Sequence, residues 1–101
     1  MSPAERLHVS GEALASVCAR YRVRELAVFG SAARGEIRPD SDLDLLVVFE
    51  DVARANLFTL IELQEDLSGL FGRHVDLVPK DGLKPVLRRE VLAEAQVLYA
   101  A

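Results

Sequence analysis

The chain has 101 residues and half of them are hydrophobic, which suits a single domain over residues 1–101 with a small core. Twelve Lys+Arg against sixteen Asp+Glu give a net charge of −4, which disfavours non-specific binding to a nucleic-acid backbone. The single cysteine, Cys18, excludes an internal disulfide, and no Cys/His spacing resembles a zinc site. Because no signal peptide or membrane-spanning run is visible, we expect a cytoplasmic protein.

The first elements are a helix and a strand. Ser10 is a favourable N-cap, and the apolar residues after it have the spacing of an amphipathic helix. This stripe consists of Leu14, Val17, Cys18 and Tyr21. Cys18 is therefore predicted to be a buried hydrophobic residue and not a reactive thiol. Residues 24–29, RELAVF, predict a short buried strand that ends at Gly30.

A short polar and alanine-rich stretch follows. Residues 31–36 are long enough for about two turns of helix. Residues 38–40 predict a turn, and Asp40 is more simply a turn residue than a ligand. Residues 43–50, LDLLVVFE, then predict a second strand.

The second half of the chain predicts two helices and one or two strands. The longest helix begins at about Asp51, ends before Gly72, and is expected to turn five apolar residues inward: Leu57, Leu60, Ile61, Leu67 and Phe71. Residues 74–79, HVDLVP, predict a third strand, and residues 97–99 a short edge strand.

The last predicted helix starts after Asp81 as its cap, with Pro85 in the first turn, and contains Leu83, Val86, Leu87 and Val91. The whole order is α-β-α-β-α-β-α. It indicates an α/β (α+β) fold with a small mixed sheet of three to four strands flanked by helices.

Three aspartates are candidate metal ligands. Asp42 and Asp44 are two residues apart, so a strand that begins near them puts both side chains on one face. Asp76 is the one charge inside an otherwise apolar strand, where a carboxylate is costly unless it is paired or binds a metal. If the second and third strands are neighbours, the three carboxylates converge on one point.

No Lys or Arg stands among Asp40, Asp42 and Asp44 to neutralise them. A hard divalent cation would do so, and oxygen-only ligands suit Mg²⁺ or Mn²⁺. Two ions held by shared carboxylates form the arrangement that enzymes use for in-line displacement at phosphorus. The same residues also mimic the start of a calcium loop, but Leu45 stands where that loop needs glycine.

The Gly30-Ser31 step fits the same chemistry. Gly30 ends a strand and lets the backbone approach a ligand closely, and Ser31 would begin a helix whose free N–H groups favour phosphate. Arg34 either contacts the same anion or forms a surface ion pair with Glu36 or Asp40.

Gly30-Ser31, ten intervening residues and then Asp42-x-Asp44 resemble the motif of the DNA-polymerase-beta-like nucleotidyltransferase superfamily. The longer string FGSAARGEIRPDSDLDLLVVF resembles its smallest branch, the minimal nucleotidyltransferases (MNT), and the similarity extends over nearly the whole chain. The resemblance implies that Asp42, Asp44 and Asp76 bind metal. It also implies that Asp76 helps to deprotonate the acceptor, and that Gly30 and Ser31 hold the phosphates of ATP.

The resemblance further implies transfer of AMP to a partner protein. Members of this branch are often paired with a helical HEPN protein as a toxin–antitoxin system, in which the MNT chain adenylylates its partner. A tyrosine hydroxyl is the expected acceptor, and Mg²⁺ with ATP the expected cofactor and substrate.

Other readings of the same residues stay open. The acids could be solvated residues at a strand end, with Asp76 on a half-exposed face. The chain could neutralise a partner by occlusion without catalysis, or could modify a small molecule such as an aminoglycoside; RNA is disfavoured as an acceptor by the net charge. His8 and His74 are simplest as solvent-facing residues, and Arg88 and Arg89 as part of a solvated helix face.

Overall fold

The structure is a computed structural model of the chain, and it describes residues 7–36, 38, 41–51 and 55–101. Its helices are α2 (Gly11–Arg20), α3 (Leu57–Phe71) and α4 (Pro85–Glu94). Its strands are β1 (Val23–Phe29), β2 (Leu43–Phe49), β3 (Val75–Pro79) and β4 (Gln96–Ala100). Two three-residue 3₁₀ turns, η1 (Gly30–Ala32) and η3 (Lys80–Gly82), follow β1 and β3. The predicted mixed fold is confirmed, including the strand near the C-terminus.

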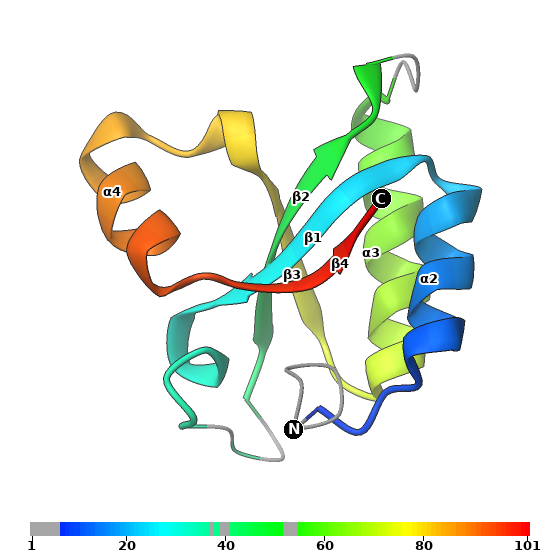
Figure 1. Cartoon of the computed structure of the whole chain (residues 1–101), viewed down its shortest axis with the longest axis horizontal. Coiled ribbons are helices and arrows are strands. Elements are labelled where there is room, and N and C mark those ends of the chain that lie inside the picture. The colour runs from blue at the N-terminus through cyan, green and yellow to red at the C-terminus, as the bar shows by residue number, and fades with distance from the viewer. Residues whose placement is uncertain (1–6, 37, 39–40, 52–54) are drawn as a thin grey trace.

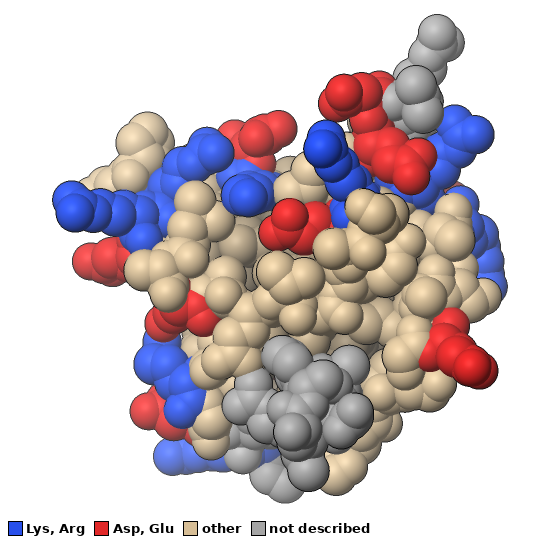
Figure 2. Space-filling model, in the orientation of Figure 1, with Lys and Arg blue, Asp and Glu red and all other residues tan. Residues whose placement is uncertain are grey.

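The four strands form one mixed sheet in the order β3-β2-β1-β4. β1 is antiparallel to both β2 and β4, whereas β2 and β3 are parallel. Helices α2 and α3 lie side by side against one face of the sheet, and α4 lies on the other side (Figure 1). Figure 2 shows basic side chains over α4 and a largely uncharged surface in the middle of the same view.

The core lies between the sheet and the pair α2–α3. Leu14 and Cys18 of α2 are fully buried there, as the stripe predicted, together with Leu63 and Leu67 of α3. Ser10 caps α2 by accepting a hydrogen bond from the backbone N–H of Ala13 at 3.3 Å, which confirms the predicted start. Among the described residues, no helix is long and apolar enough to cross a membrane.

The predicted inward face of α3 is partly wrong. Leu57 is 67% exposed and Ile61 is 44% exposed. At about 100° per residue these two side chains point about 80° and about 120° away from Leu67 around the helix axis. The helix also begins at Leu57 and not near Asp51, because Asn56 and Thr59 form a capping box at its start. Its end is as predicted, with Gly72 in the left-handed conformation.

Residues 31–36 do not form two turns of helix. Only the 3₁₀ turn η1 forms there, because Gly35 has a φ of +79° and the N–H of Glu36 returns to the carbonyl of Ser31 at 2.9 Å. The predicted turn at residues 38–40 falls largely on Pro39 and Asp40, which lie outside the described residues.

Asp81 does not cap α4. A residue before proline avoids the helical region, so Lys84 is extended (φ −63°, ψ 141°) and α4 begins at Pro85. Asp81 lies instead in the separate turn η3. Pro85 lies in the first turn of α4, as predicted.

Candidate active site

Two of the three aspartates face each other across neighbouring strands. Asp44 of β2 is in register with Asp76 of the parallel strand β3. Residues in register on adjacent strands point to the same face of the sheet, so the two carboxylates share one side. The N–H of Leu43 donates to the carbonyl of His74 at 2.9 Å and fixes the beginning of this pair of strands.

The third aspartate joins them from the segment before β2. Asp42, His74 and Asp76 each offer a ligand atom, and these atoms lie within 4.8 Å of one another. Asp42 and Asp76 are exposed, whereas Asp44 is half-buried. The structure therefore brings the three carboxylates to one end of the sheet. Asp76 is exposed to solvent, as expected if it were only a surface residue on a half-exposed face of the sheet. It nevertheless lies beside the other two acids.

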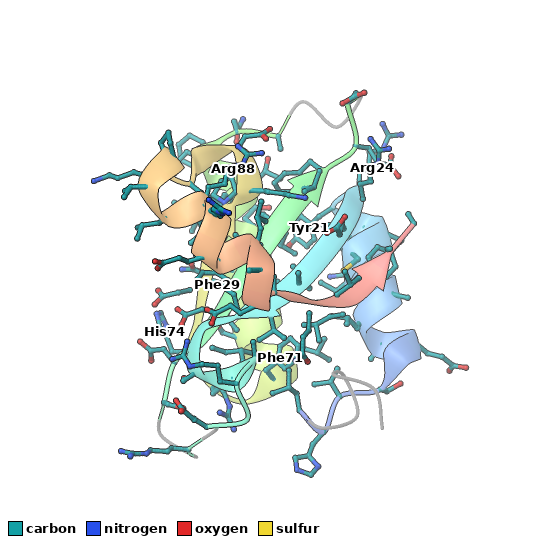
Figure 3. The ribbon with its side chains drawn as sticks, turned by 60° about the vertical axis from the view of Figure 1, so that its left-hand side comes forward. Tyr21, Arg24, Phe29, Phe71, His74 and Arg88 are labelled. Carbon is teal, nitrogen blue, oxygen red and sulfur yellow. The ribbon has the colours of Figure 1, made fainter. Side chains whose placement is uncertain are left out.

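His74 belongs to the same group, although no pattern in the sequence marks it. Its Nε2 lies 3.3 Å from Oδ1 of Asp76, and its side chain is exposed. Figure 3 shows His74 at the same end of the sheet as Phe29, the last residue of β1. A histidine just before a strand is too common to be a signal, and only the pairing of β3 with β2 brings it to the acids.

The electrostatics of Asp44 fit a cation site. Burial raises the pKa of its carboxyl, and the charges of Asp76 and Asp42 raise it further, while Arg34 lowers it. Three carboxylates that repel one another in this way are stabilised by a divalent cation between them. All three offer oxygen ligands, so the residues present fit Mg²⁺ or Mn²⁺.

The turn after β1 passes directly over Asp44. Phe29 is in register with Asp44 across the β1–β2 pair, and Gly30 follows with a φ of +72°. A Cβ on Gly30 would lie 2.5 Å from Oδ2 of Asp44. Glycine is therefore required here for two reasons, its backbone conformation and the close approach of the turn to the carboxylate.

Ser31 lies in this turn at the edge of an open hollow. The hollow has a volume of about 560 Å³ and is lined by Ser31, Glu36, Arg38 and Ser41. Because η1 is a single 3₁₀ turn, the dipole of a longer helix, which was expected to attract phosphate, is absent at this position. Any anion binding here must use local donors: N–H groups, the Ser31 hydroxyl and Arg34.

Arg34 is held by two acids. Its Nη1 lies 3.0 Å from Oε2 of Glu94, and its Nε lies 3.6 Å from Oε2 of Glu36. The hydrogen bond and charge of Glu94 raise the pKa of the Arg34 guanidinium, and Glu36 adds to the effect. Glu36 was among the ion-pair partners expected from the sequence; Glu94 was not. Nothing in the sequence marks Glu94, because it approaches Arg34 only through the pairing of β4 with β1.

Clustered carboxylates at one end of a mixed sheet, beside a Gly-Ser turn, form the arrangement that the resemblance to the nucleotidyltransferases predicts. The family comparison agrees: residues 11–98 match the nucleotidyltransferase domain family, and the chain belongs to it. It is 49% identical to the protein adenylyltransferase MntA of Thermococcus cleftensis over 75 aligned residues, and this alignment covers 74% of each chain. It is 36% identical over 81 residues to a proposed protein adenylyltransferase of Methanocaldococcus jannaschii, with 79% of each chain covered.

Solved structures give the same fold. A proposed minimal nucleotidyltransferase superimposes with a TM-score of 0.75 at 48% identity, over 94% of each chain. A toxin–antitoxin structure with AMP-PNP superimposes with a TM-score of 0.74 at 21% identity, over 92% of this chain and 75% of that one. The Shewanella oneidensis complex of a tri-AMPylated HEPN toxin with its MNT antitoxin gives a TM-score of 0.65 at 19% identity, over 90% and 70%. At such identities the last two show a common fold.

Proposed function

We propose that this chain transfers AMP from ATP to a hydroxyl group, most simply a tyrosine hydroxyl, of a HEPN-family partner protein and thereby acts as an antitoxin. The observation that carries the proposal is the convergence of Asp42, Asp44 and Asp76 beneath the turn that holds Gly30 and Ser31. The likeness to the protein adenylyltransferase MntA of Thermococcus cleftensis supports the reaction. The shared fold with the MNT antitoxin that is bound to an AMPylated HEPN toxin supports the kind of partner.

In this proposal the three aspartates hold Mg²⁺, with two ions expected and Mn²⁺ as a substitute. When bound, the metal screens the triphosphate charge and lowers the pKa of the attacking hydroxyl. The pKa of Asp44 is raised without a cation, which is consistent with a site that binds one.

The remaining residues bind and orient the nucleotide. Ser31 and Arg34 contact the triphosphate from the turn, and Gly30 allows that turn to lie against Asp44. The acceptor oxygen forms a bond to the α-phosphorus as the bond between this phosphorus and the bridging oxygen of the β-phosphate breaks. Pyrophosphate leaves, and the carboxylate of Asp76 takes the hydroxyl proton and passes it to solvent.

The acceptor is expected to come from another chain. The hollow beside Ser31 is open, and the three carboxylates lie at an exposed end of the sheet. A site this open leaves room for the side chain of a protein partner to reach the α-phosphorus. Most of the protein surface around the acceptor side chain would then belong to the partner and not to this chain.

Transfer can be tested with ATP labelled at the α-phosphate, Mg²⁺ and the product of the neighbouring gene. We expect label on the partner with the wild-type chain and with Asp81→Asn, a matched control whose exposed aspartate lies on η3. We expect the label to disappear with Asp42→Asn. Full neutralisation of the partner by Asp42→Asn without label would contradict the proposal and favour neutralisation by occlusion.

A further inference from the structure

Glu94, the last residue of α4, bridges the two parts of the turn region that face the proposed nucleotide. Its Oε1 accepts a hydrogen bond from the backbone N–H of Gly30 at 3.0 Å. Its Oε2 accepts one from Nη1 of Arg34, also at 3.0 Å. One half-buried carboxylate, 64 residues from Gly30 and 60 residues from Arg34 in sequence, thus ties a backbone group and a guanidinium together.

A second contact from the same segment holds the same turn. Nε2 of Gln96 donates to the carbonyl of Ala33 at 3.0 Å. Gln96 is also the first residue of β4 and is in register with Val28 of β1. The junction between α4 and β4 therefore contacts the segment 30–34 at three points, and the strand pairing beside it fixes where Glu94 can lie.

We infer that Glu94 is a positioning residue for nucleotide binding: it holds the Gly30 turn and sets the orientation of Arg34 for the triphosphate. This inference rests on the proposed function. A free arginine side chain loses considerable conformational entropy when it is fixed on a ligand, and one fixed in advance loses less. Within the described part of the chain the ion pairs of Arg34 use Nε and Nη1, which leaves the donors of Nη2 for a phosphate oxygen.

The two hydrogen bonds of Glu94 also give Gly30 a role other than the phosphate binding predicted from the sequence. Its N–H is already bonded to Glu94, so it contributes shape and closeness to Asp44, and the phosphate donors are Ser31 and Arg34. In the opposite role, the Glu94 carboxylate would occupy the place of a phosphate on Gly30 and Arg34, and the nucleotide would have to displace it before binding. The pairing of Gln96 with Val28, two residues on, fixes the backbone near Glu94, and the contacts with Gly30 and Arg34 hold its carboxylate in place.

The two roles differ in the sign of the effect on affinity. We expect Glu94→Ala to weaken binding of Mg²⁺·ATP to the isolated chain about tenfold by isothermal titration calorimetry, because a charge-assisted hydrogen bond is lost. Glu94→Gln keeps an acceptor for Gly30 and should weaken binding less. In transfer assays the KM for ATP should rise by the same factor while kcat changes less than twofold.

Glu90→Ala is the matched control, since it removes one acid from the exposed face of the same helix one turn earlier. It should leave the affinity unchanged. A double-mutant cycle then separates positioning from general structural support. In an Arg34→Ala background Glu94→Ala should weaken binding by clearly less than tenfold, because only the contact with the N–H of Gly30 is then left to lose.

Equal or tighter binding of ATP by both Glu94→Ala and Glu94→Gln would overturn the inference and indicate a phosphate mimic. A loss of the same factor with and without Arg34 would overturn it as well. Should Glu94→Ala fail to fold, Glu94→Gln carries the same comparison. A wild-type chain that binds no Mg²⁺·ATP would instead overturn the proposed function, and the two failures are distinguishable in one titration series.

Discussion

Asp44 is the residue in which stability and function are most clearly opposed. Its carboxylate is half-buried, lies beside two other acids, and is touched by the turn at Gly30. A raised carboxyl pKa means that the charged form is less favourable in the folded chain than in the unfolded chain. At neutral pH, without a metal ion, Asp44 therefore lowers the stability of the fold.

We predict that Asp44→Asn raises the melting temperature in the absence of divalent cations and lowers AMP transfer by about a hundredfold or more. The gain in stability should be full well above the raised pKa, decline as the pH falls through it, and vanish below the usual pKa of aspartate. Thermal unfolding of both proteins across pH 3 to pH 8, with chelator present, measures this. A variant that is less stable than the wild type at pH 7 would contradict the assignment.

Gly30 offers a test of the close approach between turn and carboxylate. Gly30→Ala places a Cβ 2.5 Å from Oδ2 of Asp44, in a backbone conformation that alanine rarely adopts. Gly35→Ala has the same backbone problem (φ +79°) but nothing within 4 Å of the new Cβ.

We expect Gly35→Ala to cost about 1 kcal/mol of unfolding free energy and to retain transfer, and Gly30→Ala to cost about twice that or more and to lose transfer. Denaturant unfolding and the labelled-ATP assay give both values. Equal effects of the two substitutions would show that the contact with Asp44 is unimportant.

The site residues that could be predicted from the sequence are those that a local pattern marks. Asp42 and Asp44 stand out by their spacing, and Asp76 by being charged inside an apolar strand. Glu94 and His74 carry no local pattern, since an acid at the end of a helix and a histidine before a strand are ordinary. Only the strand pairing brings them to the site, so a single sequence could not reveal them.

Among the elements, α3 shows where a helical pattern misleads. Five apolar residues are predicted to face inward, but Leu57 and Ile61 are exposed, and the packed stripe runs through Leu60, Leu63 and Leu67. The sequence does not say how far the sheet extends under the helix. The start of α3 has a local cause in the sequence, the Asn-x-x-Thr spacing of the capping box formed by Asn56 and Thr59.

The burial of two leucines of α3 can be compared by measuring the stability of their alanine variants. Leu67→Ala, at a fully buried position, should cost about 2–5 kcal/mol of unfolding free energy. Leu57→Ala, in the exposed first turn, should change it by less than about 0.5 kcal/mol. Urea denaturation of both variants decides the matter; similar losses would place Leu57 in the core, as the sequence alone suggested.

Helix α2 carries the one thiol, and its burial predicts how that thiol reacts. Burial raises the pKa of Cys18 to about 12, compared with 9.0 for an unperturbed thiol. The neutral thiol is favoured in the folded chain, so this contribution to stability is full below about pH 9 and is lost as the pH rises towards 12.

We expect iodoacetamide at pH 8 to leave Cys18 unmodified in the native protein and to modify it once the chain is unfolded in urea. Mass spectrometry of the alkylated chain gives the extent. Rapid alkylation under native conditions would contradict the packing of α2 against the sheet.

For the whole molecule, the mixed sheet, the family and the order of elements apart from the helix expected at residues 31–36 were predictable from the sequence, and the comparisons confirm the family. The hydrophobic periods give the elements, and the Gly-Ser and Asp-x-Asp spacing gives the class. The helix expected after Gly30 does not form, because Gly35 interrupts it. No helix dipole is therefore available at this turn to attract phosphate. The contact of the α4–β4 junction with the turn depends on the antiparallel pairing of β4 and β1, a long-range property that no local pattern contains.

The central claim is that one end of the sheet forms a single site for metal and triphosphate. Crystals of the chain grown with Mn²⁺ and a non-hydrolysable ATP analogue would test it by anomalous diffraction. We predict manganese between the carboxylates of Asp42, Asp44 and Asp76, with the triphosphate against Ser31 and Arg34. Manganese bound elsewhere, or Asp76 turned away from an ion held by the other two, would contradict the account.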